Sequence, residues 1–423
     1  MSINQAGKNE LDIHDQQTVF DKLIQPIQEF IKDQNDAISP HHNQTYCYYD
    51  FVRTLIFYFT SGRTSLKLFI NTVLNKGLLP DSINLRPVPY STFSDAFERF
   101  PSDLLREIFV FLLSSLPLKQ IPELASLGTL CCVDGSLFPV ISSMLWAEYT
   151  SKSQALRFHL CFELNRMIAV DFIIGSGKSS ERGALRKMLK SGITYIADRG
   201  YMCFTLFHDI IKCSSYFVFR VKSNLVYLSI ESMDVILPAT VRTLFENVTD
   251  SLIRCTNDQH NHIYRLVIIA IRGETFYLLT NRFNLSTFQI IMLYAYRWQI
   301  ELFFRFLKRT IGGIHLVKNT QQGVTIQFYV LLICALLELN LKQDTYQHKE
   351  AGTIQNSTTD LESNTDNAQK IHDSAISNSD QFLEFIGSGL KKYWKISVHW
   401  LSALRILMCE VFDARAIEIL GAL

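Results

Sequence analysis

The chain has 423 residues, of which 48% are hydrophobic and 12% aromatic, enough for two or three domains with buried cores. Its formal net charge of +1 gives no evidence for nucleic-acid binding from overall charge, although basic residues gather locally. The nine cysteines include no Cys-x-x-Cys pair, which argues against a disulfide framework or structural zinc and favours a reducing cytosol.

Residues 1–125 are predicted to form a helical N-terminal domain. Apolar residues recur there at helical spacing in VFDKLIQPIQEFI, DFVRTLIFYFTSG and DLLREIFVFLLSSL. This domain is a candidate for holding DNA ends, and a purely structural helical bundle is the open alternative. The N-terminus lacks a secretory signal, and the longest apolar run, 328–337, is too short to cross a bilayer. No membrane partner is therefore expected.

Residues 126–342 are predicted to form an α/β catalytic domain. The apolar run LCCVD reads as a strand that ends at Asp134, and LRFHLCFEL alternates in the manner of a half-buried strand. MIAVDFII is a third strand, and the turn GSGKSS leads into the helix ERGALRKMLK. ITYIAD is a strand that ends at Asp198, and the helix YMCFTLFHDIIK and the strand SYFVFRVK follow it.

The remaining sequence predicts an insertion, a helix and a polar segment. Residues from about 223 to 285 read as a β-rich insertion, and the helix after it is expected to end at Gly312-Gly313. Residues 343–381 are rich in Asn, Asp, Ser and Thr and are predicted to be disordered. The pattern becomes helical again over 382–423.

The segment YAYRWQIELFFRFLKR carries the most informative spacing in the chain. At about 100° per residue, one narrow helical stripe would carry a phenol, three cations and one carboxylate: Tyr294, Arg297, Glu301, Arg305 and Lys308. A lone acid among phosphate-seeking cations indicates a metal ligand held beside a nucleic-acid backbone. The alternative is a solvated face with ion pairs at i,i+4.

Two further carboxylates occupy positions where functional groups of an α/β sheet gather. Asp134 and Asp198 each follow a predicted strand, and Glu301 would reach them from its helix. Oxygen ligands of this kind suit Mg²⁺, or Mn²⁺ in its place, and a pair of such ions supports hydrolysis and transesterification of phosphodiesters. Taken singly, each Asp is also explained as a turn or cap residue.

Basic residues near these acids are candidate DNA contacts. Arg199 follows Asp198 directly, and Arg220 and Lys222 alternate on a predicted strand, so that they share one face. A local ion pair for Arg199 and a plain solvent face for the other two are the alternatives.

The sequence resembles the DDE transposases of bacterial insertion sequences, specifically the insertion-sequence-four family. The family motif Tyr-x2-Arg-x3-Glu-x6-Lys is matched by Tyr294, Arg297, Glu301 and Lys308. Val133-Asp134-Gly135 resembles its first block and Asp198-Arg199-Gly200-Tyr201 its second. The resemblance covers roughly residues 40–340.

The resemblance implies a ribonuclease-H-like fold in which Asp134, Asp198 and Glu301 bind two divalent ions. Tyr294, Arg297 and Lys308 would contact transposon-end phosphates. The implied reaction is cleavage of double-stranded DNA at terminal inverted repeats, often through a hairpin, and strand transfer into target DNA. The implied working form is a homodimer in the bacterial cytoplasm, associated with the nucleoid. A ribonuclease-H-like endonuclease without strand transfer and an inactive DNA-binding descendant remain as alternatives.

Overall fold

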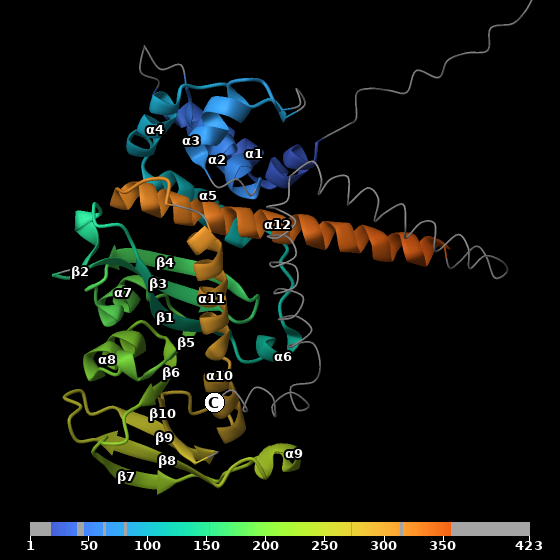
Figure 1. Cartoon of the computed structure of the whole chain (residues 1–423). Helices are drawn as coiled ribbons and strands as arrows, with labels where there is room; N and C mark the ends of the chain where they lie inside the picture. The colour runs from blue at the N-terminus through green and yellow to red at the C-terminus, as the bar shows by residue number, and fades with distance from the viewer. Residues whose placement is uncertain are drawn as a thin grey trace, which may run out of the picture. The chain divides into compact units, whose positions relative to one another are not determined.

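A computed structural model describes residues 18–39, 46–61, 65–79, 83–151, 153–271, 273–313 and 316–356 (Figure 1). The described chain divides into two compact units. One holds the described residues up to Pro117 together with those from Ile326 onward, and the other holds Leu118–Thr325. The predicted C-terminal helices over 382–423 lie outside the described residues.

The first unit is built from helices: α1 (Val19–Ala37), α2 (Tyr48–Thr60), α3 (Leu66–Leu68), the π-helix η2 (Phe69–Leu74), α4 (Tyr90–Arg99), α5 (Ser102–Ser115) and α12 (Gln321–Asn356). Thr18 caps α1, because its side chain accepts a hydrogen bond from the amide of Asp21 at 3.0 Å. Aromatic rings form the core, with Phe51 lying 5.2 to 5.5 Å from three other phenylalanines. Such ring pairs stabilise the unit beyond their buried area.

Helix α12 corrects the prediction that disorder begins at residue 343. The helix continues to Asn356, and the rest of the segment predicted to be disordered lies outside the described residues. Its first half is apolar and buried, so the polar residues that follow extend a helix that has already formed, and adding a residue costs far less than nucleating one. Residues Gln321–Leu341 are long and apolar enough to cross a membrane, but 72% of the apolar window is buried, as in the core helix of a folded domain.

The second unit contains one mixed sheet. Its strands are β1 (Thr129–Pro139), β2 (Glu148–Thr150), β3 (Ser153–Glu163), β4 (Ile168–Ser176), β5 (Ile193–Ala197), β6 (Tyr216–Val221), β7 (Tyr227–Ser232), β8 (Asn247–Cys255), β9 (Ile263–Ile271) and β10 (Glu274–Thr280). The order is β2-β3-β1-β5-β6-β10-β9-β8-β7, with β4 beside β3. Strands β1, β5 and β6 are parallel, whereas β10 is antiparallel to β6. The β-rich insertion therefore extends the same sheet.

Helices connect and flank these strands. They are α6 (Pro122–Ala125), η4 (Leu145–Ala147), α7 (Glu181–Met188), η5 (Arg199–Tyr201), α8 (Phe204–Lys212), α9 (Ala239–Arg242), α10 (Thr287–Ala295) and α11 (Trp298–Gly313). The mixed α/β class predicted from the sequence is thus confirmed. Helix α11 ends at Gly313, within the glycine pair expected to stop it.

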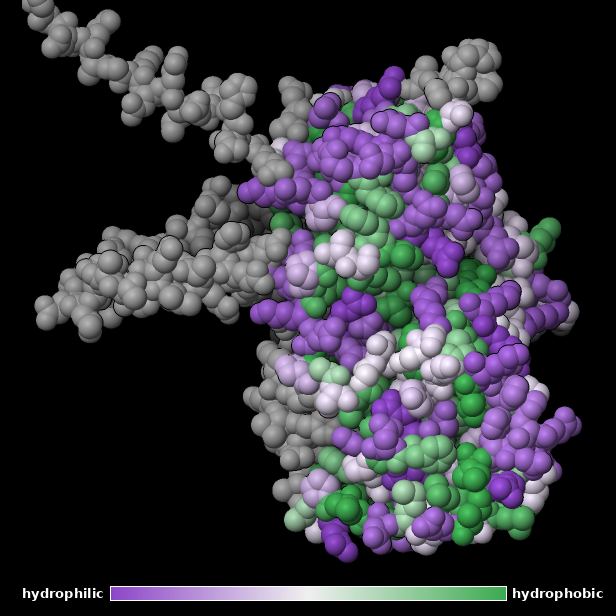
Figure 2. Space-filling view, turned by 180° about the vertical axis from the view of Figure 1, so that it is seen from behind, coloured by the Kyte–Doolittle hydropathy of each residue, from purple (hydrophilic) through white to green (hydrophobic). Residues whose placement is uncertain are grey.

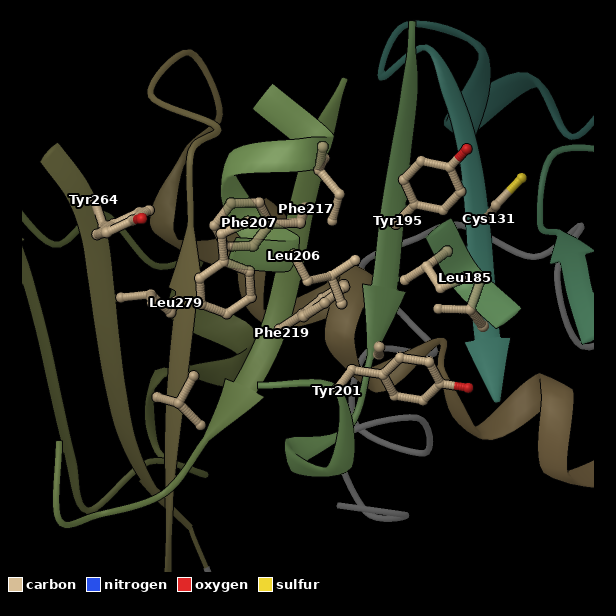
Figure 3. Packing of buried hydrophobic residues seen from close by; sticks show 14 of the residues in the cluster. Cys131, Leu185, Tyr195, Tyr201, Leu206, Phe207, Phe217, Phe219, Tyr264 and Leu279 are labelled. Carbon is tan, nitrogen blue, oxygen red and sulfur yellow. The ribbon is translucent and has the colours of Figure 1, made fainter. Parts of the chain in front are cut away.

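Helices α7 and α8 cover one face of the sheet through a cluster of buried residues. In Figure 3, Leu185 from α7 lies close to Cys131 of β1, and Phe207 from α8 lies against Phe217 of β6. The rings of Phe207 and Phe217 stack with centroids 4.4 Å apart. Alternate residues of each strand point into this cluster, as the two-residue repeat of a strand requires.

Helices α10 and α11 pack against other residues of the same strands. Helix α11 packs on β1, and Phe303 on α11 lies 5.2 Å from Phe162 of β3, measured between ring centroids. Helix α10 packs on β5 and β6, and its apolar residues from Ile290 to Leu293 are fully buried. The acidic residues singled out in the sequence lie where these helices meet the sheet.

Candidate active site

Asp134 and Asp198 occupy matching positions on neighbouring parallel strands. Cys132 of β1 pairs with Ile196 of β5, and each Asp lies two residues further along its strand. Asp198 follows the end of β5, and its side chain accepts a hydrogen bond from the amide of Arg199 at 2.7 Å. Both acids thus follow the last paired residues of two adjacent parallel strands, where functional groups of an α/β sheet gather.

The expectation that Asp134 ends its strand is wrong. Asp134 lies inside β1, because β1 stays paired with β3 from Cys131 to Pro139, with Asp134 opposite Leu160. Only the pairing with β5 stops before Asp134. Asp134-Gly135 is therefore extended strand, which removes the alternative explanation that this Asp is a turn residue.

Strand alternation aims both aspartates toward α10 and α11. Cys131 and Val133 point into the cluster beneath α7, so Cys132 and Asp134 point the other way. The thiol of Cys132 lies 4.0 Å from the carbonyl oxygen of Tyr296, which follows α10. The hydroxyl of Tyr294 donates to Asp198 Oδ1 at 3.3 Å.

The predicted continuous helix through Tyr294 and Glu301 is in fact two helices. Helix α10 ends at Ala295 and α11 begins at Trp298. Between them the amide of Arg297 donates to the carbonyl of Tyr294, and the amide of Ile300 to that of Arg297, so the bonds tighten from i−4 to i−3. Tyr294 consequently ends one helix and Glu301 lies in the first turn of the next.

Arg297 connects the acidic groups. Its Nη2 donates to Glu301 Oε1 at 2.7 Å, which is the i,i+4 ion pair that the sequence left open. Burial alone would lower the pKa of the Arg297 guanidinium, but Tyr294, Glu301 and Asp198 raise it. The same cation is therefore held by groups from both helices and by Asp198 beside β5.

Asp134 lies among other acids in a partly buried position. Burial raises its pKa to about 6, the hydrogen bond from the Gly135 amide and the charge of Arg297 lower it, and the charges of Glu181 and Glu301 raise it further. Burial and the two acids therefore outweigh the charge of Arg297 at this carboxylate. Asp134, Asp198 and Glu301 supply oxygen-only ligands of the kind that Mg²⁺ and Mn²⁺ prefer, so the residue types fit such ions.

The side chains are not arranged as a closed metal cage. Within the described parts of the chain, no three His, Cys, Asp or Glu side chains converge in a way that would hold a metal ion. Glu301 is instead engaged by Arg297. Joint coordination would need Glu301 to turn from Arg297 toward Asp134.

Glu181 is a fourth acid at this place, and the sequence did not single it out. It is the first residue of α7, where an acidic residue is ordinary because it complements the helix dipole. Its charge nevertheless acts on Asp134. In the fold, Gly135 and Gly200 leave room for the Glu181 side chain, and the sequence alone carries no signal of this contact.

The predicted DNA-contacting cations lie in several places of the second unit. Arg199 and Lys222 line one pocket of about 250 Å³, together with Arg182 and Phe204. Arg220 lies elsewhere, with its guanidinium 4.4 Å from the Phe276 ring, so the predicted shared use of Arg220 and Lys222 stays a prediction.

Arg305 and Lys308 on α11 are exposed. Arg305 lies 5.7 Å from the Trp298 ring centroid, and the Lys308 ammonium lies 5.7 Å from that of Phe138. Figure 2 shows hydrophilic and hydrophobic residues interspersed over the described part of one face, so hydropathy there does not single out a binding surface. The case for these cations therefore rests on their nearness to Glu301 along the same helix.

Comparison with known proteins identifies relatives of the second unit. Residues 126–337, half of the chain, match the family described as Transposase DDE domain. A putative transposase, y4zB, of Sinorhizobium fredii is 25% identical over 256 residues, which cover 58% of this chain and 70% of that protein. A probable transposase for insertion sequence element IS5377 of Geobacillus stearothermophilus is 21% identical over 251 residues, covering 59% of this chain and 66% of that protein.

Proposed function

The chain belongs to the DDE-domain transposase family, and from this premise we propose that it cleaves DNA at insertion-sequence ends and joins those ends to target DNA. Membership of the family establishes a transposase, an enzyme that acts on DNA. The proposal adds the site, the ions and the order of steps. Its main support is the placement of Asp134 and Asp198 at matching positions of two parallel strands, with both side chains directed at the helices that carry Tyr294 and Glu301.

Asp134, Asp198 and Glu301 are proposed to hold two divalent ions, Mg²⁺ or in its place Mn²⁺. When bound, such ions activate a water or a 3′-hydroxyl and stabilise the leaving oxygen of the scissile phosphate. The raised pKa of Asp134 supports this assignment, because burial and, to a smaller extent, the charges of Glu181 and Glu301 disfavour its ionised form, and a bound cation would favour it.

The chain's own cations and its phenol have separate roles in this proposal. Tyr294 orients Asp198 through the hydrogen bond from its hydroxyl. Arg297 holds Glu301 until the metal site fills, and then becomes available to a DNA phosphate as a forked donor. Lys308 and Arg305, exposed on α11, would contact the end DNA. Arg199 and Lys222, which line one pocket, and Arg220, which interacts with Tyr294, would also contact DNA.

The finer description of the fold is part of the proposal. The strand order β4-β3-β1-β5-β6, with β3 antiparallel to β1, supports a ribonuclease-H-like core over 126–342 that is extended by the insertion at about 223–285. The four matched motif residues support membership of the insertion-sequence-four family. DNA-end binding by the helical N-terminal domain, a homodimer across two ends, and a cytoplasmic, nucleoid-associated location complete the proposal.

The test uses the full-length protein and DNA carrying the short inverted repeats that flank its reading frame. We expect nicking at the repeat ends with Mg²⁺ and none with EDTA. Asp134→Asn, Asp198→Asn and Glu301→Gln should each lower the nicking rate by about 100-fold or more, while binding of the ends persists. Asp209→Asn is the matched control, since it neutralises an ion-paired carboxylate on α8 of the same unit.

Two outcomes would change the proposal. Undiminished nicking by all three variants would remove the acids from the active site. Metal-dependent nicking without joining of a free 3′-hydroxyl end to target DNA would favour an endonuclease that lacks strand transfer.

A further inference from the structure

Glu181 touches both of the backbone segments that carry the aspartates. A Cβ atom added to Gly135 would lie 3.1 Å from Glu181 Oε1, and one added to Gly200 would lie 3.1 Å from Oε2. Gly135 follows Asp134 directly, and Gly200 is two residues after Asp198. One carboxylate therefore lies against both segments, each oxygen facing one of them.

The side chain of Glu181 is held in this position from the neighbouring strand. Arg157 on β3 donates through Nη1 to Glu181 Oε1 and through Nε to the carbonyl oxygen of Gly177 at 3.2 Å. The next residue of α7, Arg182, donates through Nε to the carbonyl oxygen of Gly200 at 3.1 Å. The first turn of α7 thus binds the segment after Asp198 through two consecutive side chains.

A buried histidine marks the same place independently. His159 is 1% exposed, and its Nε2 lies 2.9 Å from Ser179 Oγ. Its Nδ1 would lie 3.2 Å from a Cβ atom on Gly135 and has no hydrogen-bond partner among the described residues. Buried polar atoms are usually satisfied, so an unsatisfied one beside a carboxylate indicates a site that acquires a ligand or a water.

A merely structural role for Glu181 explains less of this geometry. An acidic residue at the start of a helix commonly complements the helix dipole. Here, however, the cap of α7 is already supplied by Ser180, whose hydroxyl accepts from the Gly183 amide. The two Glu181 oxygens face Gly135 and Gly200 instead.

We infer that Glu181 is a positioning residue for the metal-binding carboxylates, an inference that rests on the proposed function. It fixes the spacing between the segments of Asp134 and Asp198, and its charge adds to theirs in attracting divalent ions. Arg157 keeps Glu181 in place. Groups next to metal ligands commonly contribute about 10- to 100-fold in metal affinity or activity.

The experiment measures Mn²⁺ binding to the full-length protein without DNA, by electron paramagnetic resonance of the free ion. Wild type is compared with Glu181→Gln, Asp134→Asn and Glu163→Gln. Glu163 is the matched control, because it lies on β3, is more buried than Glu181, and pairs with Arg166 at 2.7 Å. Glu181→Gln and Glu163→Gln therefore both remove a Glu–Arg ion pair, and they differ in the position of that pair.

We expect Glu181→Gln to weaken Mn²⁺ binding by about 10-fold, Asp134→Asn to weaken it at least as much, and Glu163→Gln to leave it unchanged. In the nicking assay, the Mn²⁺ concentration for half-maximal rate should rise in parallel for Glu181→Gln, and saturating Mn²⁺ should recover most of the rate. A general folding defect would lower the rate at every Mn²⁺ concentration.

The outcomes separate this inference from the proposed function. If Asp134→Asn loses Mn²⁺ binding while Glu181→Gln binds as wild type does, Glu181 has no positioning role and the proposed active site stands. If Asp134→Asn binds Mn²⁺ as wild type does, the proposed metal site fails and the inference fails with it. A loss in Glu163→Gln equal to that in Glu181→Gln would also overturn the inference.

Discussion

Two aspartates of the second unit, the buried Asp250 and the partly buried Asp134, have opposite surroundings. Asp250 on β8 is 1% exposed and receives hydrogen bonds from Arg265 at 2.9 and 2.6 Å and from the Thr287 hydroxyl at 2.7 Å. Asp134 on β1 receives one from the amide of Gly135 at 2.7 Å, with Glu181 and Glu301 as acidic neighbours. The charge of Asp250 is thus compensated by Arg265, whereas the charged neighbours of Asp134 are Arg297 and two acids.

The contrast between Asp250 and Asp134 shows that the partners of a buried carboxylate indicate its role. Arg265 is 2% exposed and holds carbonyl oxygens of the chain as well as Asp250, so that pair fixes where the insertion joins α10. A buried carboxylate with its partners present is a structural element, and one without them is a candidate for chemistry.

The largest effect on stability is expected from the satisfied acid. Asp250→Asn leaves the Arg265 charge buried and uncompensated, which should lower the free energy of unfolding by about 3 to 5 kcal/mol. Urea-induced unfolding followed by circular dichroism measures it. The control is Asp209→Asn on α8, whose exposed pair with Arg186 should change stability by less than about 1 kcal/mol. If Asp250→Asn and wild type have equal free energies of unfolding, Asp250 does not stabilise the fold by its pair with Arg265.

Neutralising Asp134 should have the opposite effect on stability. Burial is the main reason that the pKa of Asp134 is raised from 3.8 to about 6. The folded protein therefore favours the protonated carboxyl, and stability falls as pH rises from about 4 to about 6. Asp134→Asn should therefore stabilise the metal-free protein by about 1 to 3 kcal/mol near pH 7.5, and by almost nothing near pH 4.

Thermal unfolding in EDTA at the two pH values tests this expectation. Adding Mg²⁺ near neutral pH should raise the midpoint of wild type more than that of the variant. A variant less stable than wild type at both pH values would mean that Asp134 is satisfied within the fold.

The smallest effect on stability concerns an exposed cation. Lys308 forms no ion pair among the residues that the structure describes, in contrast to Arg265. Lys308→Ala should change the free energy of unfolding by less than about 0.5 kcal/mol. It should nevertheless reduce the slope of log affinity for end DNA against log salt by about one. An unchanged slope in a filter-binding or anisotropy titration would remove Lys308 from the DNA interface.

The sequence predicted the central elements well where one local pattern dominates. The alternation from Leu156 to Leu164 predicted β3, and the apolar runs before Asp134 and Asp198 predicted β1 and β5. Within the predicted β-rich insertion, local pattern does not mark strand β8, because its buried Asp250 interrupts the apolar alternation. The long-range pair with Arg265 makes that residue compatible with a core.

Two features of the site were beyond the reach of local pattern. The interruption between α10 and α11 carries neither Pro nor Gly, so helical spacing ran through it without a signal. Glu181 reads as an ordinary first-turn acid, and only the fold brings it against Gly135 and Gly200. Whether the named acids and cations perform the assigned roles stays a prediction for the experiments above.

The way the insertion joins the sheet has an evolutionary consequence. It leaves from β6 and returns on β10, and Val221 pairs with Tyr277 at the junction. Entry and exit are thus anchored side by side, so residues gained or lost in the β7–β8 connection, 233–246, change the outer rim of the sheet and leave the spacing of the acids intact.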